Sequence, residues 1–416
     1  MEFELGPTDR YNRLIGQFDP TAELPITAGA KAAYALNPIA ELPVAQFTAL
    51  GGATYPGANG KDRKLWANSL NWMPRLAVAY QFSRTTVLRM GYGLYFDTLN
   101  VQNEGPSLNQ LGYSWPTATT LTNDFGQHWL IGNPGGGVSP MTDPFPVRSD
   151  NTRFDTPPGS NLGAMAPVGR GYTFLPYDRP HARQNRWRLD LQRQLGASMV
   201  VNVSYAGSYS DNIPINQSQS ALPAQYLSYD STRNNTVANN LNTNVPNPYN
   251  ISNFGSLRTS NPTLYQYMSS NAFFTSATIR KSALLAPFPQ MNGLTKTVPL
   301  GKAKTEELGV SFQRRFSKGL NTSVAYTKLY NYAADYFPNT FDASPAWEPS
   351  NKGRPHRLTS TAVAQLPFGR GRRWLQTGPL SWIAGGFQLT GIQEYQPGAL
   401  VTWPSKIGRA SCRERV

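Results

Sequence analysis

The sequence predicts an all-β fold, and three observations predict it. Charged residues make up 15% of the 416 residues while aromatic residues reach 12%, whereas soluble domains carry roughly 25% charged residues. The 36 glycines and 34 prolines are spread along the chain, as expected where turns recur. Several segments alternate apolar and polar side chains, and this is the period of a strand whose two faces meet different surroundings.

The alternation is clearest from Val87 to Asp97. One face of this segment carries only apolar side chains, namely Leu88, Met90, Tyr92, Leu94 and Phe96. The opposite face is small, polar or charged and includes Arg89 and Asp97. The segment 72–82 alternates in the same way, and Ser83-Arg84-Thr85 is short enough to join the two as a hairpin.

The same pattern recurs, so that about eight strands form four pairs. The pairs lie within residues 71–97, 185–208, 305–330 and 355–395. Three-residue turns close three of the pairs, whereas the links between pairs are very long, at 98–185, 208–305 and 330–354. Short turns at one end and long loops at the other are typical of an outer-membrane barrel.

We therefore expect part of a large antiparallel transmembrane β-barrel, with long extracellular loops and short periplasmic turns. Strands of this length cross a membrane when they are tilted. A closed barrel of only eight strands would have a packed interior and would be dwarfed by its loops, so a larger barrel fits better. Aromatic residues near strand ends are expected to form interfacial girdles: Trp72, Phe96, Trp187, Tyr205, Phe316, Tyr330 and Tyr395. The alternative is that these aromatics are core residues of a soluble sandwich.

Charge and hydropathy exclude other classes. The mean hydropathy is −0.43, and no run approaches the roughly 18 apolar residues that a spanning helix needs. The net charge of +14 is compatible with nucleic-acid or anionic-lipid binding. We favour scattered arginines instead and expect no nucleic-acid partner, because no Lys/Arg-rich block occurs. The densest group, Arg370, Arg372 and Arg373, sits beside glycines in a turn.

The two ends of the chain are unusual. Residues 1–5 contain neither a basic region nor an apolar stretch of the kind that signal peptides have, so we expect the native start to lie upstream. Residues 407–416 (IGRASCRERV) correspond to the translation of a common sequencing adapter, because ATCGGAAGAGC encodes the Ile-Gly-Arg-Ala that opens them. We exclude this tail from the fold, which leaves residues 1–406 as the barrel portion and removes Cys412, the only cysteine.

An ordered series of motifs resembles the Oar-like TonB-dependent receptors. The matching segments are NWMPRLAVAYQFSRTTVLRMGYGLYFD (71–97), QNRWRLDLQRQLGASMVVNVSYAGSYSDNI (184–213), LLAPFPQMNGL (284–294), LGVSFQRRFSKGLNTSVAYTKLYN (308–331), RPHRLTSTAVAQLPFGRGRRWL (354–375) and GGFQLTGIQEYQPGALVT (385–402). Each motif alone is weak, whereas their order over residues 71–402 is specific.

The resemblance implies a barrel of roughly 22 strands, with a regulatory-like domain and a plug ahead of it. It implies no cofactor, an outer-membrane location in contact with lipid, and energy from the TonB–ExbB–ExbD system through N-terminal parts that this sequence lacks. Substrate uptake would then belong to the full-length parent, and the sequence does not reveal the substrate.

The barrel interpretation places six polar side chains toward the lumen, where they contact a plug or line a substrate path, or else only solvate the interior. These residues are Arg89, Asp97, Arg188, Asp190, Gln313 and Arg315. We expect no catalytic, cofactor or metal site, and so no enzyme. A metal pair of His181 and His356 lacks further ligands at suitable spacing, and His128 stands apart.

Two other functions compete with energised uptake. A passive porin or structural outer-membrane protein would have the same barrel pattern. A soluble, secreted β-sandwich that binds sugars or surfaces would instead bury its apolar strand faces against each other.

Overall fold

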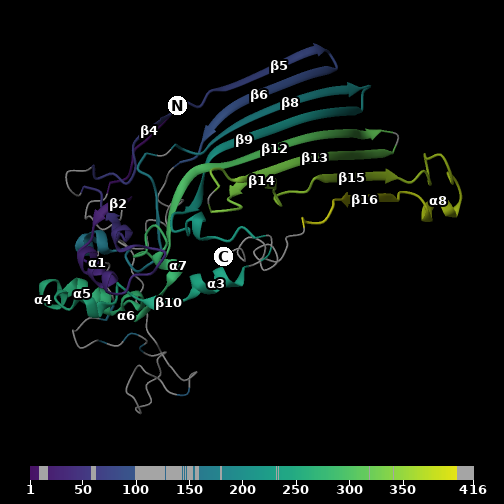
Figure 1. Cartoon of the computed structure of the whole chain (residues 1–416). Helices are drawn as coiled ribbons and strands as arrows, with labels where there is room; N and C mark the ends of the chain where they lie inside the picture. The colour runs from purple at the N-terminus through teal and green to yellow at the C-terminus, as the bar shows by residue number, and fades with distance from the viewer. Residues whose placement is uncertain are drawn as a thin grey trace.

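The computed structural model describes most of the chain, and the fold is a long curved sheet with a lobe of short helices and strands at one end (Figure 1). The described residues are 1–8, 17–57, 62–98, 159–178, 180–230, 234–317, 319–340 and 342–400, with isolated positions at 127, 143, 145, 147, 153, 154 and 232. His128 and the predicted tail at 407–416 lie outside this part.

The sheet is an up-and-down meander in which each strand pairs antiparallel with the next. Its strands in chain order are β5 (Arg75–Ser83), β6 (Thr86–Phe96), β8 (Arg183–Leu195), β9 (Met199–Ser218), β12 (Leu294–Ser317), β13 (Leu320–Tyr336), β15 (His356–Gln365) and β16 (Gln388–Tyr395). Two short strands join it, because β7 (Tyr172–Phe174) pairs with β12 and β14 (Ala346–Pro349) pairs with β13. Each of the four predicted pairs is a hairpin here, and β5 and β16 are the edges of the described sheet.

Local chemistry sets where these hairpins begin and turn. The first strand of the large sheet, β5, begins at Arg75, directly after Pro74, because proline has no N–H to donate to a neighbouring strand. Gly196 and Gly319 have φ of +64° and +81°, a conformation that glycine adopts without steric cost, and each lies in the short turn of its hairpin.

The two faces of the sheet differ along its whole width. Residues that are register partners on neighbouring strands point to the same face. One such row is apolar on all eight strands of the meander: Tyr80, Leu88, Leu191, Val203, Val310, Tyr326, Leu358 and Tyr395. The adjacent row points to the other face and is small or polar: Ala79, Arg89, Asp190, Ser204, Gly309, Thr327 and Arg357.

No second layer of described residues covers the apolar face. The side chains of Leu76, Tyr80 and Leu389 are 68%, 57% and 66% exposed, although each lies on this face. A β-sandwich would bury such side chains between its sheets, so the sandwich alternative is wrong for the described structure. A face that is apolar, continuous and uncovered has the character of a surface that meets lipid.

The buried core of the described chain lies in the lobe. Its largest wholly buried side chains include Trp66, Tyr34, Tyr249, Phe47 and Phe274. The lobe contains the helices α1 (Thr27–Leu36), α3 (Asn235–Asn242), α4 (Leu257–Ser260), α5 (Pro262–Ser269), α6 (Ala272–Thr275) and α7 (Lys281–Leu284). The 3-10 helices here are η1 (Val44–Gln46), η4 (Gly159–Met165), η5 (Ala224–Tyr226) and η6 (Ile251–Phe254).

Asparagines start several of the lobe's helices. The side-chain oxygen of Asn234 accepts from the Val237 amide at the start of α3. Asn261 does the same for Leu264 in α5, where Pro262 occupies the first helical turn. Such caps satisfy amides that have no partner within the helix. Three small sheets complete this end of the molecule: β1 (Glu2–Glu4) with β4 (Ser69–Asn71), β2 (Gln17–Glu23) with β3 (Leu50–Thr54), and β10 (Asn244–Pro246) with β11 (Thr278–Arg280).

The link at 208–305 differs from the loop that the sequence predicts. β9 continues to Ser218, and β12 already begins at Leu294, so the two strands pair well beyond the alternating region. Because the two polar extensions satisfy each other's backbone groups, they need no apolar face. The rest of the link is folded into the lobe.

The turn at 366–387, between β15 and β16, is longer than the other turns at its end of the sheet. It contains the short helix α8 (Pro379–Ile383) and extends past the ends of the neighbouring strands (Figure 1). No helix among the described residues is long and apolar enough to span a membrane.

Candidate functional site

Three of the six predicted lumen-facing residues form one cluster on the polar face. Arg89 on β6 is the register partner of Asp190 on β8. Arg188 and Asp190 form an ion pair through two hydrogen bonds, with Nε–Oδ2 at 2.5 Å and Nη2–Oδ1 at 3.0 Å. Arg89 donates from Nη1 to Gln192 Oε1 at 2.8 Å. The cluster therefore joins β6 and β8 through side chains as well as through the ladder.

The other three predicted residues lie apart from this cluster. Asp97 follows the last residue of β6, and its amide donates to the carbonyl of Ala182 at 2.8 Å. Gln313 and Arg315 are on β12 near the short turns. No hydrogen bond or ion pair found in the described residues joins them to Arg89, Arg188 or Asp190.

A hollow of about 700 Å³ opens beside the cluster, and of the six predicted residues only Arg188 lines it. Tyr95 lies in it, with the guanidinium carbon of Arg75 at 4.7 Å and that of Arg186 at 5.2 Å from the ring centroid. Both distances are those of a cation–π contact. Arg75 and Arg186 have the period-two spacing of the polar face, and this signal was present in the sequence.

Small residues make the floor of this hollow. Register pairing places Ala77, Gly91, Arg188, Ala206 and Glu307 in one row across five strands. A Cβ added to Gly91 would have no neighbour nearer than 3.8 Å, so open space lies above it. Glu307 lines the hollow at the far end of this set, two strands from Arg188, which corresponds to about 10 Å.

The two described histidines have separate structural partners. His181 is 4% exposed, and its Nδ1 donates to the carbonyl of Asp97 at 2.9 Å, while Nε2 lies 2.6 Å from the Ser69 hydroxyl. The ring of His356 lies between the Tyr326 hydroxyl (2.7 Å) and Lys328 Nζ (3.0 Å). Within the described residues, no group of three or more His, Cys, Asp or Glu side chains is placed to hold a metal ion.

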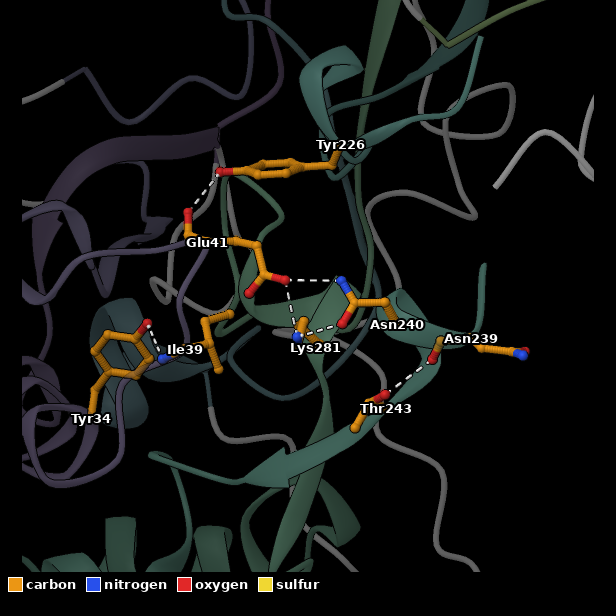
Figure 2. Close-up of polar contacts among 8 residues, drawn as sticks. All are labelled: Tyr34, Ile39, Glu41, Tyr226, Asn239, Asn240, Thr243 and Lys281. Atoms are coloured by element: carbon orange, nitrogen blue, oxygen red, sulfur yellow. Dashed lines mark hydrogen bonds and ion pairs between the residues drawn. The ribbon is translucent and has the colours of Figure 1, made fainter. Parts of the chain in front are cut away.

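A polar network ties the N-terminal segment to the β9–β12 link within the lobe (Figure 2). Lys281 Nζ lies 3.0 Å from Glu41 Oε1 and 2.7 Å from Asn240 Oδ1. Asn240 also donates to Glu41 Oε1 at 2.9 Å. These three residues come from segments that are far apart in the sequence, so their contacts hold the lobe together as one unit.

Hydrogen bonding lowers the pKa of Glu41 in this network, whereas burial raises the pKa of tyrosines in the lobe core. The hydrogen bond from Asn240, helped by the ammonium of Lys281, lowers the pKa of Glu41 and keeps it ionised. Burial raises the pKa of Tyr34, whose hydroxyl donates to the carbonyl of Leu42 at 2.5 Å. Burial likewise raises the pKa of Tyr55 and of Tyr249, so these phenols stay neutral in the lobe core.

An antiparallel meander with one uncovered apolar face and one polar, hollowed face has the architecture of a membrane β-barrel wall. The family model described as "Outer membrane beta barrel domain" matches residues 1–411, and the chain belongs to that family. Its location is therefore the outer membrane. No curated protein matches the chain.

Solved structures of outer-membrane transporters show a distant similarity. The FrpB iron transporter from Neisseria meningitidis (F3-3 variant) is 9% identical, with a TM-score of 0.30 over 72% of this chain and 25% of that one. The outer membrane transporter YddB from Escherichia coli is 9% identical, with a TM-score of 0.32 over 78% and 33% of the two chains. The siderophore receptor PirA from Pseudomonas aeruginosa is 10% identical, with a TM-score of 0.29 over 76% and 33%. The chain thus spans a quarter to a third of the length of these proteins.

Proposed function

We propose that the full-length parent of this chain is an energised outer-membrane receptor that takes up a substrate, as the resemblance to Oar-like TonB-dependent receptors implies. The observation that carries the proposal is the contrast between the two faces of the meander. The apolar side of the sheet contacts lipid, while the polar side bears charged residues and a hollow of about 700 Å³. A barrel wall of this kind encloses a polar lumen.

The barrel is completed by further strands of the parent protein. β5 and β16 do not pair with each other in the described sheet, and in hydrocarbon an open edge would leave backbone N–H and C=O groups unsatisfied. Arg89, Asp97, Arg188, Asp190, Gln313 and Arg315 face the lumen of that barrel. The short turns face the periplasm, and the lobe faces the cell exterior.

Coupling to TonB–ExbB–ExbD is the part of the proposal that separates it from a passive porin. The decisive experiment reconstitutes the purified parent into planar lipid bilayers and measures its conductance. A plugged receptor stays closed without energy, whereas a porin conducts continuously.

Two further measurements accompany it. The upstream reading frame should encode a plug, and a photocrosslinker placed near the parent's N-terminus should capture TonB in cells. A steady open conductance together with the lack of a plug-coding region would refute the receptor and favour the porin.

A further inference from the structure

The hollow on the polar face holds two arginines in an arrangement that ion pairing within the chain does not explain. Arg75 and Arg186 both stack on the ring of Tyr95, within 5.2 Å of its centroid. They come from β5 and β8, the two strands that flank β6, which carries Tyr95. Two like charges on one ring repel each other, so the arrangement favours an anion that contacts both.

Neither arginine has an acidic partner among the described residues, and Arg186 donates from Nε to the neutral side chain of Gln184. Other arginines of the sheet do, since Arg183 pairs with Asp211 and Arg357 pairs with Glu394. Within the hollow itself, Arg188 is already held by Asp190. Within the hollow, the positive charge that no carboxylate balances therefore lies at the end formed by Arg75, Tyr95 and Arg186.

Glycine fixes the shape of this end. A Cβ on Gly93 would lie 2.8 Å from the Tyr95 ring, so the ring occupies the space that a larger residue would fill. Next to it, the open space above Gly91 leaves room for a ligand against the sheet. The guanidinium groups thus border a cavity with a flat floor and an aromatic wall.

We propose that this end of the hollow binds an oxyanion group, a carboxylate or a phosphate, of the substrate that the parent takes up. The inference rests on the proposed function, because it needs the polar face to line the lumen. Arg75 and Arg186 bind the anion through the planar donor fork of their guanidinium groups, and the Tyr95 ring packs against the body of the ligand. Glu307 repels anions at the far end, so the anionic group binds at the Arg75–Arg186 end.

The test uses the full-length parent in detergent at constant ionic strength. The probes are tricarballylate, which carries carboxylates, and inorganic pyrophosphate, and binding is measured by calorimetry and by the rise in melting temperature. The double variant R75Q/R186Q weakens binding of the effective probe by about tenfold per arginine, as expected when a charge-assisted hydrogen bond is lost.

The matched control is R84Q/R193Q. It removes the same charge, but Arg84 lies in the β5–β6 turn and Arg193 lies on the apolar face of β8. This variant keeps wild-type affinity. In addition, Y95F keeps affinity and Y95L loses it, because the proposal needs the ring and not the hydroxyl.

Binding that falls equally in both double variants, or no binding of either probe by the wild type, would overturn the proposal. The wild type would also bind neither probe if an acidic side chain of the parent filled the hollow, and the proposal would then be wrong. The proposed function fails separately, through an open conductance in bilayers, so the two failures are distinguishable. A preference for one probe assigns the group as carboxylate or phosphate.

Discussion

Arginine introduced at Val310 tests the assignment of the lipid-facing surface. On β12 the apolar residues of this face, Leu308, Val310 and Phe312, lie between Glu306 and Arg314. Those two charged residues are eight positions apart, which corresponds to about 27 Å along a strand and to about 20 Å along the membrane normal at a tilt of about 40°. This is close to the apolar band of about 25 Å that barrels present to lipid.

Val310 is at the middle of that stretch, and Val203 and Tyr326 are its apolar register partners. An arginine at the bilayer midplane costs about 2–4 kcal/mol. The matched control is Ser311→Arg, one residue along, whose side chain points to the polar face beside Asn202 and Ala325. There the change in unfolding free energy stays within about 0.5 kcal/mol.

Both variants are made in the full-length parent, which is reconstituted into phosphatidylcholine vesicles and unfolded with denaturant while tryptophan fluorescence is recorded. The difference in the free energy of unfolding between the variants is the measured quantity. Equal losses at the two positions, or a larger loss for Ser311→Arg, would show that the apolar face does not meet lipid.

Three further predictions concern the lobe and the sheet. Lys281→Met removes the cation that helps to lower the pKa of Glu41. The lowered pKa stabilises the lobe at pH values above the pKa that the carboxylate has in the unfolded chain. This stabilisation is lost as the pH falls through the pKa of the folded state. On acidification the variant therefore loses less hydrogen-exchange protection in α3 and α7 than the wild type does. Tyr267→Phe destabilises the lobe by about 1 kcal/mol, since its hydroxyl donates to the carbonyl of Val168 at 2.7 Å; an unchanged melting temperature would contradict this. Gly207→Val places a Cβ 2.4 Å from the indole of Trp187 and costs about 1–3 kcal/mol in denaturant titrations, whereas Ser208→Val, on the other face, serves as the neutral comparison.

The hairpins were predictable because alternation is a local property of a strand. In 87–97 every second side chain is apolar, and this alone indicates which residues share a face, whatever the strand pairs with. The same periodicity places Arg89, Arg188 and Asp190 on the polar face, while the register between β6 and β8 decides that Arg89 lies opposite Asp190. The pairing of β6 with β8 across the long link at 98–185 follows the rule that consecutive strands tend to be neighbours.

The sequence missed features whose parts lie far apart in the chain. β9 and β12 were predicted too short, because their extensions lack alternation and are held by each other's backbone. The lobe was predicted as loops, although Asn-Pro-Thr at 261–263 is a recognisable helix start. Its core forms only when segments on both sides of the first four strands of the sheet meet, as where the ring of Phe47 lies 6.2 Å from that of Tyr249.

The sequence by itself determined the strands, the identity of their two faces and the membership of this chain in a class of outer-membrane barrels, since each of these depends on patterns within short segments. Only the tertiary structure decided which charges meet. Glu41 and Lys281 are 240 positions apart, and Arg75, Tyr95 and Arg186 come from three different strands. The physical reason is that register and loop packing, which bring such residues within a few ångströms, are set by contacts summed over the whole fold and leave no periodic trace in the sequence around any one of them.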